Sequence, residues 1–111
     1  MNILDFLREH PQWFVSVNFT DGFGVRIDVD GDRITGRMDR GLISGISRDW
    51  VITVKEPEEQ ELSLKGTYSS GLIIHDTVDM TLTAPGPDAV LTIRFHHRGF
   101  DDDTLTMTLD E

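Results

Sequence analysis

WFVSVNFTDGFGVRIDV, residues 13–29, contains two runs in which apolar and polar residues alternate, separated by Thr20-Asp21-Gly22. Alternation with a period of two places the apolar side chains on one face of a strand and the polar side chains on the other. The segment between the runs is a strong turn signal, and a connection this short forces the two strands to be antiparallel. We therefore predict an antiparallel hairpin with one buried face.

The same alternation continues to the end of the chain, with turn-forming residues between the runs. Residues 2–10 are the one helical candidate, because their apolar residues have helical spacing and Pro11 ends the segment. The predicted strands are residues 13–19, 23–29, 32–46, 50–56, 60–68, 72–83, 89–100 and 104–110. Eight strands with short connections predict an all-β fold, an antiparallel up-and-down barrel in a single domain over residues 1–111, with the helix plugging one end.

Two alternatives satisfy the same pattern. The eight-strand interpretation treats residues 32–46 as one long strand bent at Gly36 and Gly41, since glycines inside strands mark bends and barrel corners. A true turn at Asp39-Arg40-Gly41 would give nine strands instead. A β-sandwich of two sheets is the main rival to the barrel, because it would bury one face of every strand in the same way.

The composition limits the classes of partner. The 111 residues carry a formal net charge of −10, which argues against nucleic acid and anionic membranes and permits a basic protein partner. The chain has no cysteine, so disulfides and thiolate chemistry are excluded. No apolar run approaches the ~20 residues of a membrane span, and no secretory signal is recognised at the N-terminus. We expect a cytoplasmic location and no cofactor.

A short helix followed by Trp13 at the start of an eight-strand meander resembles the calycin barrels, that is, the lipocalins and their fatty-acid-binding relatives. It also resembles the de novo designed eight-stranded barrels built on that architecture. In this sequence Pro11-Gln12-Trp13 stands where lipocalins have Gly-x-Trp. The resemblance implies a closed barrel whose interior holds a small apolar or aromatic ligand, or a designed scaffold of that type.

Aligning the apolar faces of neighbouring strands predicts a register. Val78 opposite Phe95 puts Asp76 opposite His97 on the inward face, where opposed Cβ atoms are ~5 Å apart. The same alignment pairs Val17 with Val25, Ile27 with Ile34, Ile46 with Trp50, Leu62 with Val78, and Leu109 with Phe95. An Asp–His pair inside a barrel either contacts a ligand or fixes the strand register as a mutually satisfied polar pair.

The sequence thus predicts a ligand site inside the barrel, near the end opposite the helix. Its expected residues are Phe23, Trp50, Leu64, Tyr68, Asp76, His97 and Met107. We assign no catalytic residue and no metal site, since His96 and His97 face opposite ways and no third ligand accompanies His75 and His96. Two other functions remain open: an acidic interaction domain of the inhibitor or immunity type, and an isomerase or cyclase that uses the barrel interior.

Overall fold

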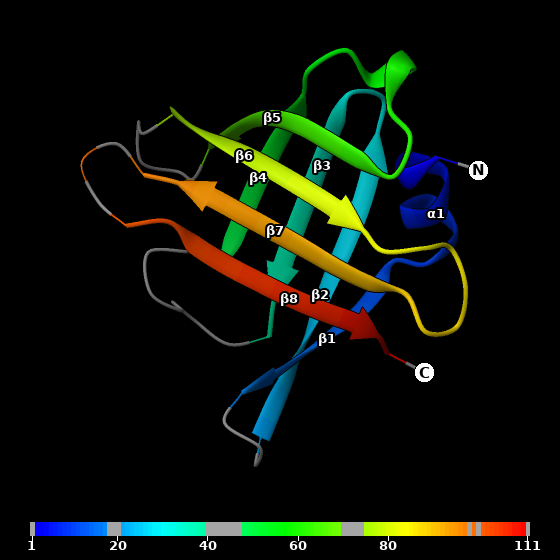
Figure 1. Cartoon of the computed structure of the whole chain (residues 1–111). Coiled ribbons are helices and arrows are strands. Elements are labelled where there is room, and N and C mark those ends of the chain that lie inside the picture. Colours follow the sequence, from blue (N-terminus) through cyan, green and yellow to red (C-terminus); the bar gives the residue numbers. More distant parts are fainter. Residues whose placement is uncertain are drawn as a thin grey trace.

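A computed structural model describes residues 2–17, 21–39, 48–69, 75–97, 99 and 101–110 of the chain. One helix precedes eight strands, with a short 3₁₀ helix between the fourth and fifth (Figure 1). The elements are α1 (Ile3–Glu9), β1 (Gln12–Val17), β2 (Asp21–Asp30), β3 (Arg33–Met38), β4 (Asp49–Val54), η1 (Pro57–Glu59), β5 (Ser63–Ser69), β6 (His75–Leu82), β7 (Val90–His96) and β8 (Asp103–Leu109). No helix within these ranges has the length and apolar character of a membrane span.

The eight described strands form a closed barrel in chain order. Each strand is antiparallel to the next, and β1 closes the ring by pairing with β8 through Trp13 opposite Leu109. Closure removes both sheet edges, which in an open sheet would leave unpaired backbone groups. The predicted all-β up-and-down barrel is confirmed, and the β-sandwich alternative is excluded.

Helix α1 lies at one end of the barrel (Figure 1). The Asn2 side chain caps the helix by accepting a hydrogen bond from the Asp5 backbone N–H at 2.9 Å. Seven residues are too few to hold a helix in isolation. The apolar residues of α1 are all buried in the barrel core: Ile3, Leu4, Phe6 and Leu7. At about 1.5–3 kcal/mol for each fully buried side chain, this contact stabilises the helix.

The observed register confirms one predicted hairpin and corrects the others. Val78 pairs with Phe95 as the sequence predicted. The other partners differ: Trp13 faces Val25, Val29 faces Ile34, Leu64 faces Met80, and Ile93 faces Leu105. Every error is a slip by an even number of residues. Alternation specifies which face of the sheet a residue occupies. A slip by an even number of residues leaves every residue on the same face, so the alternation pattern cannot distinguish the two registers.

Turn chemistry explains one of these slips. We predicted a turn over Asp30-Gly31, but Asp30 pairs with Arg33, so the two turn residues are Gly31 and Asp32. Gly31 has a φ of 63° at the first central position. Type II′ hairpin turns place glycine there because this left-handed conformation strains other residues. The turn therefore moves by one residue, which gives Gly31 the strained position and changes the strand pairing by two residues, so that Ile34 faces Val29 and not Ile27.

The largest correction concerns the predicted strand over residues 32–46. β3 ends at Met38, and residues 40–46 of that prediction lie outside the described part of the chain. Trp50 pairs with Gly36 and not with Ile46. A Cβ atom at Gly36 would overlap Cζ2 of the Trp50 indole. Because Gly36 has no side chain, the Trp50 indole can pack directly against the backbone of β3 inside the core.

Candidate functional site

An aromatic cluster lies inside the barrel, at the end opposite α1. It combines Trp50 from the start of β4 with Tyr68 and Phe95 from the ends of β5 and β7. The Phe95 ring meets Tyr68 edge-on at 4.9 Å between centroids, and it meets Trp50 edge-on at 6.1 Å. Edge-to-face contacts at these distances are the favoured geometry of aromatic pairs. All three rings are buried, so the cluster is part of the barrel core.

The Trp50 indole carries a polar group without a partner. Its Nε1 atom is buried and makes no hydrogen bond to any group in the described part of the chain. The other tryptophan behaves differently, because Trp13 Nε1 donates to the His10 carbonyl oxygen at 2.7 Å. Buried indole N–H groups usually find an acceptor. The unpartnered N–H of Trp50 is therefore the unusual feature of the core.

Next to this cluster, His97 follows the last residue of β7. Its Nε2 atom lies 2.7 Å from Oδ2 of Asp103, the first residue of β8. Both side chains are mostly buried. The backbone of Asp76 pairs with Tyr68 on β5, at the same end of the barrel. The Asp76 side chain lies outside the described part of the chain, so its contact with His97 stays a prediction.

The other predicted site residues are spread along the barrel. Phe23 is buried near the start of β2, opposite Val15. Leu64 pairs with Met80, and Met107 pairs with Leu91. Strand direction places Leu64 and Met107 in the half of the barrel nearer α1, where they contribute to the core. Their predicted position beside His97 depended on the slipped register and is wrong.

On the outer face, His96 forms a second and distinct cluster. Its Nε2 atom lies 2.6 Å from Oδ2 of Asp79 on β6, and its Nδ1 atom lies 3.1 Å from Oδ2 of Asp102. The hydrogen bond to Asp79, supported by Asp102, raises the pKa of His96 above its usual value, while desolvation opposes the rise. One imidazole thus links β6, β7 and the segment that leads into β8.

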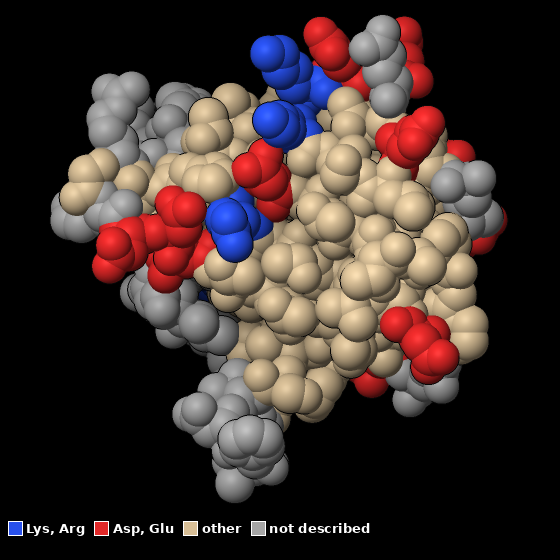
Figure 2. Space-filling model, viewed as in Figure 1, with Lys and Arg blue, Asp and Glu red and all other residues tan. Residues whose placement is uncertain are grey.

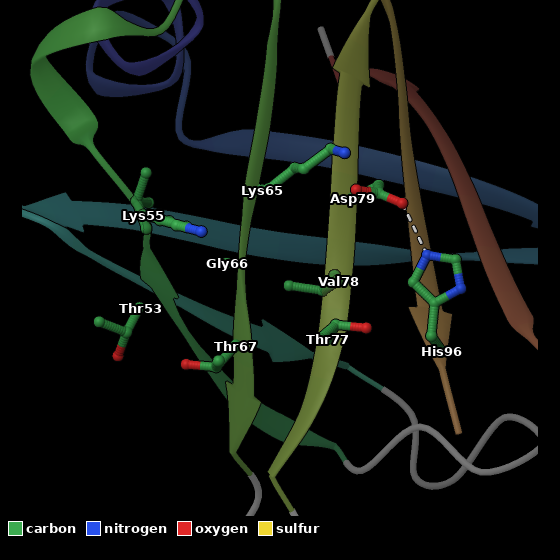
Figure 3. A pocket seen from close by; sticks show the side chains of 10 residues that line it. Thr53, Lys55, Lys65, Gly66, Thr67, Thr77, Val78, Asp79 and His96 are labelled. Carbon is green, nitrogen blue, oxygen red and sulfur yellow. Dashed lines mark hydrogen bonds and ion pairs between the residues drawn. The ribbon is translucent and has the colours of Figure 1, made fainter. Parts of the chain in front are cut away.

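The outer face of β4–β7 is hollowed into a groove of about 800 Å³ beside His96. Figure 3 shows Thr53, Thr67 and Thr77 in one row across the strands, with Lys55, Lys65 and Asp79 in the next. Two further grooves lie on the outer face, one over β2–β5 and one over β5–β7. The second of these shares Lys65 and Asp79 with the first groove. Among the described side chains, no group of three His, Asp or Glu residues is placed to hold a metal ion.

Sequence reasoning did not predict the contacts of His96 with Asp79 and Asp102, the contact of His97 with Asp103, or the side-by-side placement of Lys55 and Lys65. A usable signal existed for Asp79. Once Val78 is set opposite Phe95, Asp79 and His96 become diagonal neighbours on the outer face, within reach of their side chains. The lysines carried no such signal, since outward charged residues are normally only a solvated surface.

Comparison of the chain with models of protein families, with curated proteins and with solved structures found no match.

Proposed function

We propose that this protein binds a small apolar or aromatic molecule inside the barrel, at the end opposite α1, and that Trp50 Nε1 donates a hydrogen bond to it. The observation that carries the proposal is the buried, unpartnered N–H of Trp50. A buried donor without an acceptor costs about 1–3 kcal/mol. A ligand carbonyl, ether or carboxylate oxygen at this position would recover that free energy.

The surroundings of the indole favour an aromatic or apolar ligand over a polar one. Phe95 and Tyr68 present apolar ring surface beside Trp50. Ligand sites in proteins generally combine such surfaces with a few polar groups that fix orientation. The His97–Asp103 pair at the same end supplies polar atoms near the site. This arrangement agrees with the calycin-like interpretation, in which the barrel interior holds the ligand.

Two aromatic probes that differ in one feature test the proposal. Coumarin has a carbonyl acceptor, whereas naphthalene has a similar size and no acceptor. We expect calorimetric titration to give tighter binding of coumarin to the wild-type protein. The variant Trp50→Phe keeps a ring at this position and removes the donor, so it should bind the two probes equally.

The matched control is Trp13→Phe, which removes the other indole. Trp13 Nε1 is already bonded to His10, so this variant should keep the preference for coumarin, provided that circular dichroism shows it to be folded. Equal binding of both probes by the wild-type protein, or an unchanged preference in Trp50→Phe, would contradict the role given to the indole.

A second candidate function rests on the acidic end of the barrel. The connections at the α1 end carry exposed carboxylates: Asp30, Asp32, Glu56, Glu58, Glu61 and Asp88. Figure 2 shows acidic side chains along the edge where α1 and η1 lie. Such a rim would steer a basic protein toward this end. Titration with hen lysozyme tests this candidate, since binding should weaken with salt and be lost in the triple variant E56Q/E58Q/E61Q.

A further inference from the structure

The outer face of β4–β7 carries three basic side chains without an ion-pair partner among the described residues, and two of them, Lys55 and Lys65, line the groove beside His96. Lys55 directly follows β4, Lys65 lies on β5 and Arg94 lies on β7. All three side chains are exposed, and none forms an ion pair with another described residue. Carboxylates outnumber Lys and Arg by 20 to 10 in this chain. Three unpaired cations on one face of so acidic a protein form a local exception to its charge.

Backbone register brings these cations into one row. The Lys55 backbone N–H donates to the Lys65 carbonyl at 2.8 Å, which sets the two lysines side by side on neighbouring strands. Lys65 faces Asp79, and Asp79 faces Arg94. Like charges directly opposite each other on a sheet destabilise it. The lysine pair therefore has a cost that a bound anion would remove.

Asp79 is the one carboxylate among the described residues of this row, and it forms a hydrogen bond with His96. Its Oδ2 atom lies 2.6 Å from His96 Nε2, and Figure 3 draws this contact across the edge of the groove. With Asp79 engaged by the imidazole, the row keeps an excess of positive charge. Asp102 lies on the other side of His96, where it contacts Nδ1.

Beside the cations, the groove offers hydroxyl groups. Thr53 faces Thr67, and Thr67 faces Thr77, so the three threonines form a second row parallel to the first. All three are exposed. Phosphate oxygens accept hydrogen bonds from both hydroxyl and ammonium groups. The bonds from the ammonium groups are charge-assisted and are about twice as strong as neutral ones.

We propose that the groove between Lys55 and His96 binds a small anion with two or more phosphate groups. Lys55 and Lys65 hold its charge, and Thr53, Thr67 and Thr77 donate hydrogen bonds to its oxygens. The groove volume of about 800 Å³ accommodates a ligand larger than a single phosphate. The overall charge of −10 does not prevent this. Screening over ~8 Å at physiological ionic strength leaves the local cations dominant. This site is separate from the interior site and does not depend on it.

Titration of the full chain with inorganic tripolyphosphate at physiological ionic strength tests the proposal. In NMR spectra, the largest changes in amide chemical shift should occur on β4–β7, at the row of threonines and at the row that contains the two lysines. The double variant K55Q/K65Q should weaken binding at least tenfold. Thr67→Val, which keeps the shape and removes a hydroxyl, should weaken it by a smaller factor.

The matched control is R26Q/R33Q, which removes the same charge from exposed positions on β2 and β3. It should weaken binding less than twofold, and Trp50→Phe should leave binding unchanged. Equal losses in K55Q/K65Q and R26Q/R33Q would overturn the proposal, because they would indicate non-specific attraction. Wild-type shifts centred elsewhere on the barrel, or no shifts at 10 mM tripolyphosphate, would also overturn it. Shift mapping on the wild-type protein decides the matter even where a variant fails to fold.

Discussion

The Trp50 indole occupies the space that a side chain at Gly36 would fill. Gly36 on β3 pairs with Trp50 on β4, and a Cβ atom at Gly36 would overlap three carbons of the indole ring. Gly36 is buried, so the space left by its missing side chain lies in the interior, where the Trp50 ring fills it. The pair therefore holds the indole in the core, beside Phe95 and away from an acceptor for its N–H.

Replacing Gly36 by alanine should destabilise the protein by about 3 kcal/mol, because the new methyl group overlaps the Trp50 ring. In the double variant G36A/W50F, the smaller ring should recover about 1–2 kcal/mol of this loss. Urea unfolding of the four proteins in this cycle measures the coupling. A coupling near zero would contradict the packing of Trp50 against Gly36.

The two tryptophans should differ in their contributions to stability. Trp13→Phe loses the hydrogen bond to the His10 carbonyl, which ties β1 to the end of α1. Trp50→Phe loses no hydrogen bond and removes an unsatisfied donor. Since both changes remove a similar volume, Trp13→Phe should cost about 1–3 kcal/mol more in free energy of unfolding. Equal costs by urea unfolding would indicate that Trp50 Nε1 has an acceptor in the free protein.

The raised pKa of His96 should make the protein less stable as the pH rises. Its pKa is raised in the folded state by Asp79, with help from Asp102. The resulting stabilisation is fully present below the unfolded pKa of about 6.5 and is lost as the pH rises through the folded pKa. The free energy of unfolding of the wild type should therefore fall relative to His96→Gln as the pH rises from 6 to 9. The difference should stay below ~1 kcal/mol, because the pair is partly exposed.

NMR titration of the His96 ring protons tests whether Asp79 and Asp102 raise the pKa of His96. Asp79→Asn should lower the pKa of His96 more than Asp102→Asn does, since the hydrogen bond to Asp79 is the largest contribution. The reverse order would contradict the assignment of Asp79 as the main partner. An unchanged pKa in both variants would contradict the whole cluster.

The sequence predicted the barrel because strand alternation and turn residues are local properties. It predicted the wrong register for most hairpins because an even slip leaves every residue on the same face. Val78 and Phe95 came out paired as predicted, which kept Asp79 and His96 on one outer face. The sequence predicts an interior position for Trp50, which is confirmed, but it does not predict the pairing with Gly36, because a single bent strand over residues 32–46 pairs Trp50 with Ile46.

The candidate sites were harder to predict than the fold. Asp103, which contacts His97 in the structure, lies across a turn whose length the sequence did not define. Lys55 and Lys65 become neighbours only through the β4–β5 pairing, so their charge is ordinary until that register is known. An unsatisfied group such as Trp50 Nε1 has no sequence signature, because its environment is built from several strands at once.

Native mass spectrometry of the protein as isolated tests the central claim most directly. If Trp50 binds a small molecule inside the barrel, the wild-type protein should retain a bound mass that dissociates on activation, and Trp50→Phe should lose it while Trp13→Phe keeps it. A wild-type spectrum that shows only the bare 12.6 kDa chain, together with no preference for coumarin over naphthalene, would contradict the claim.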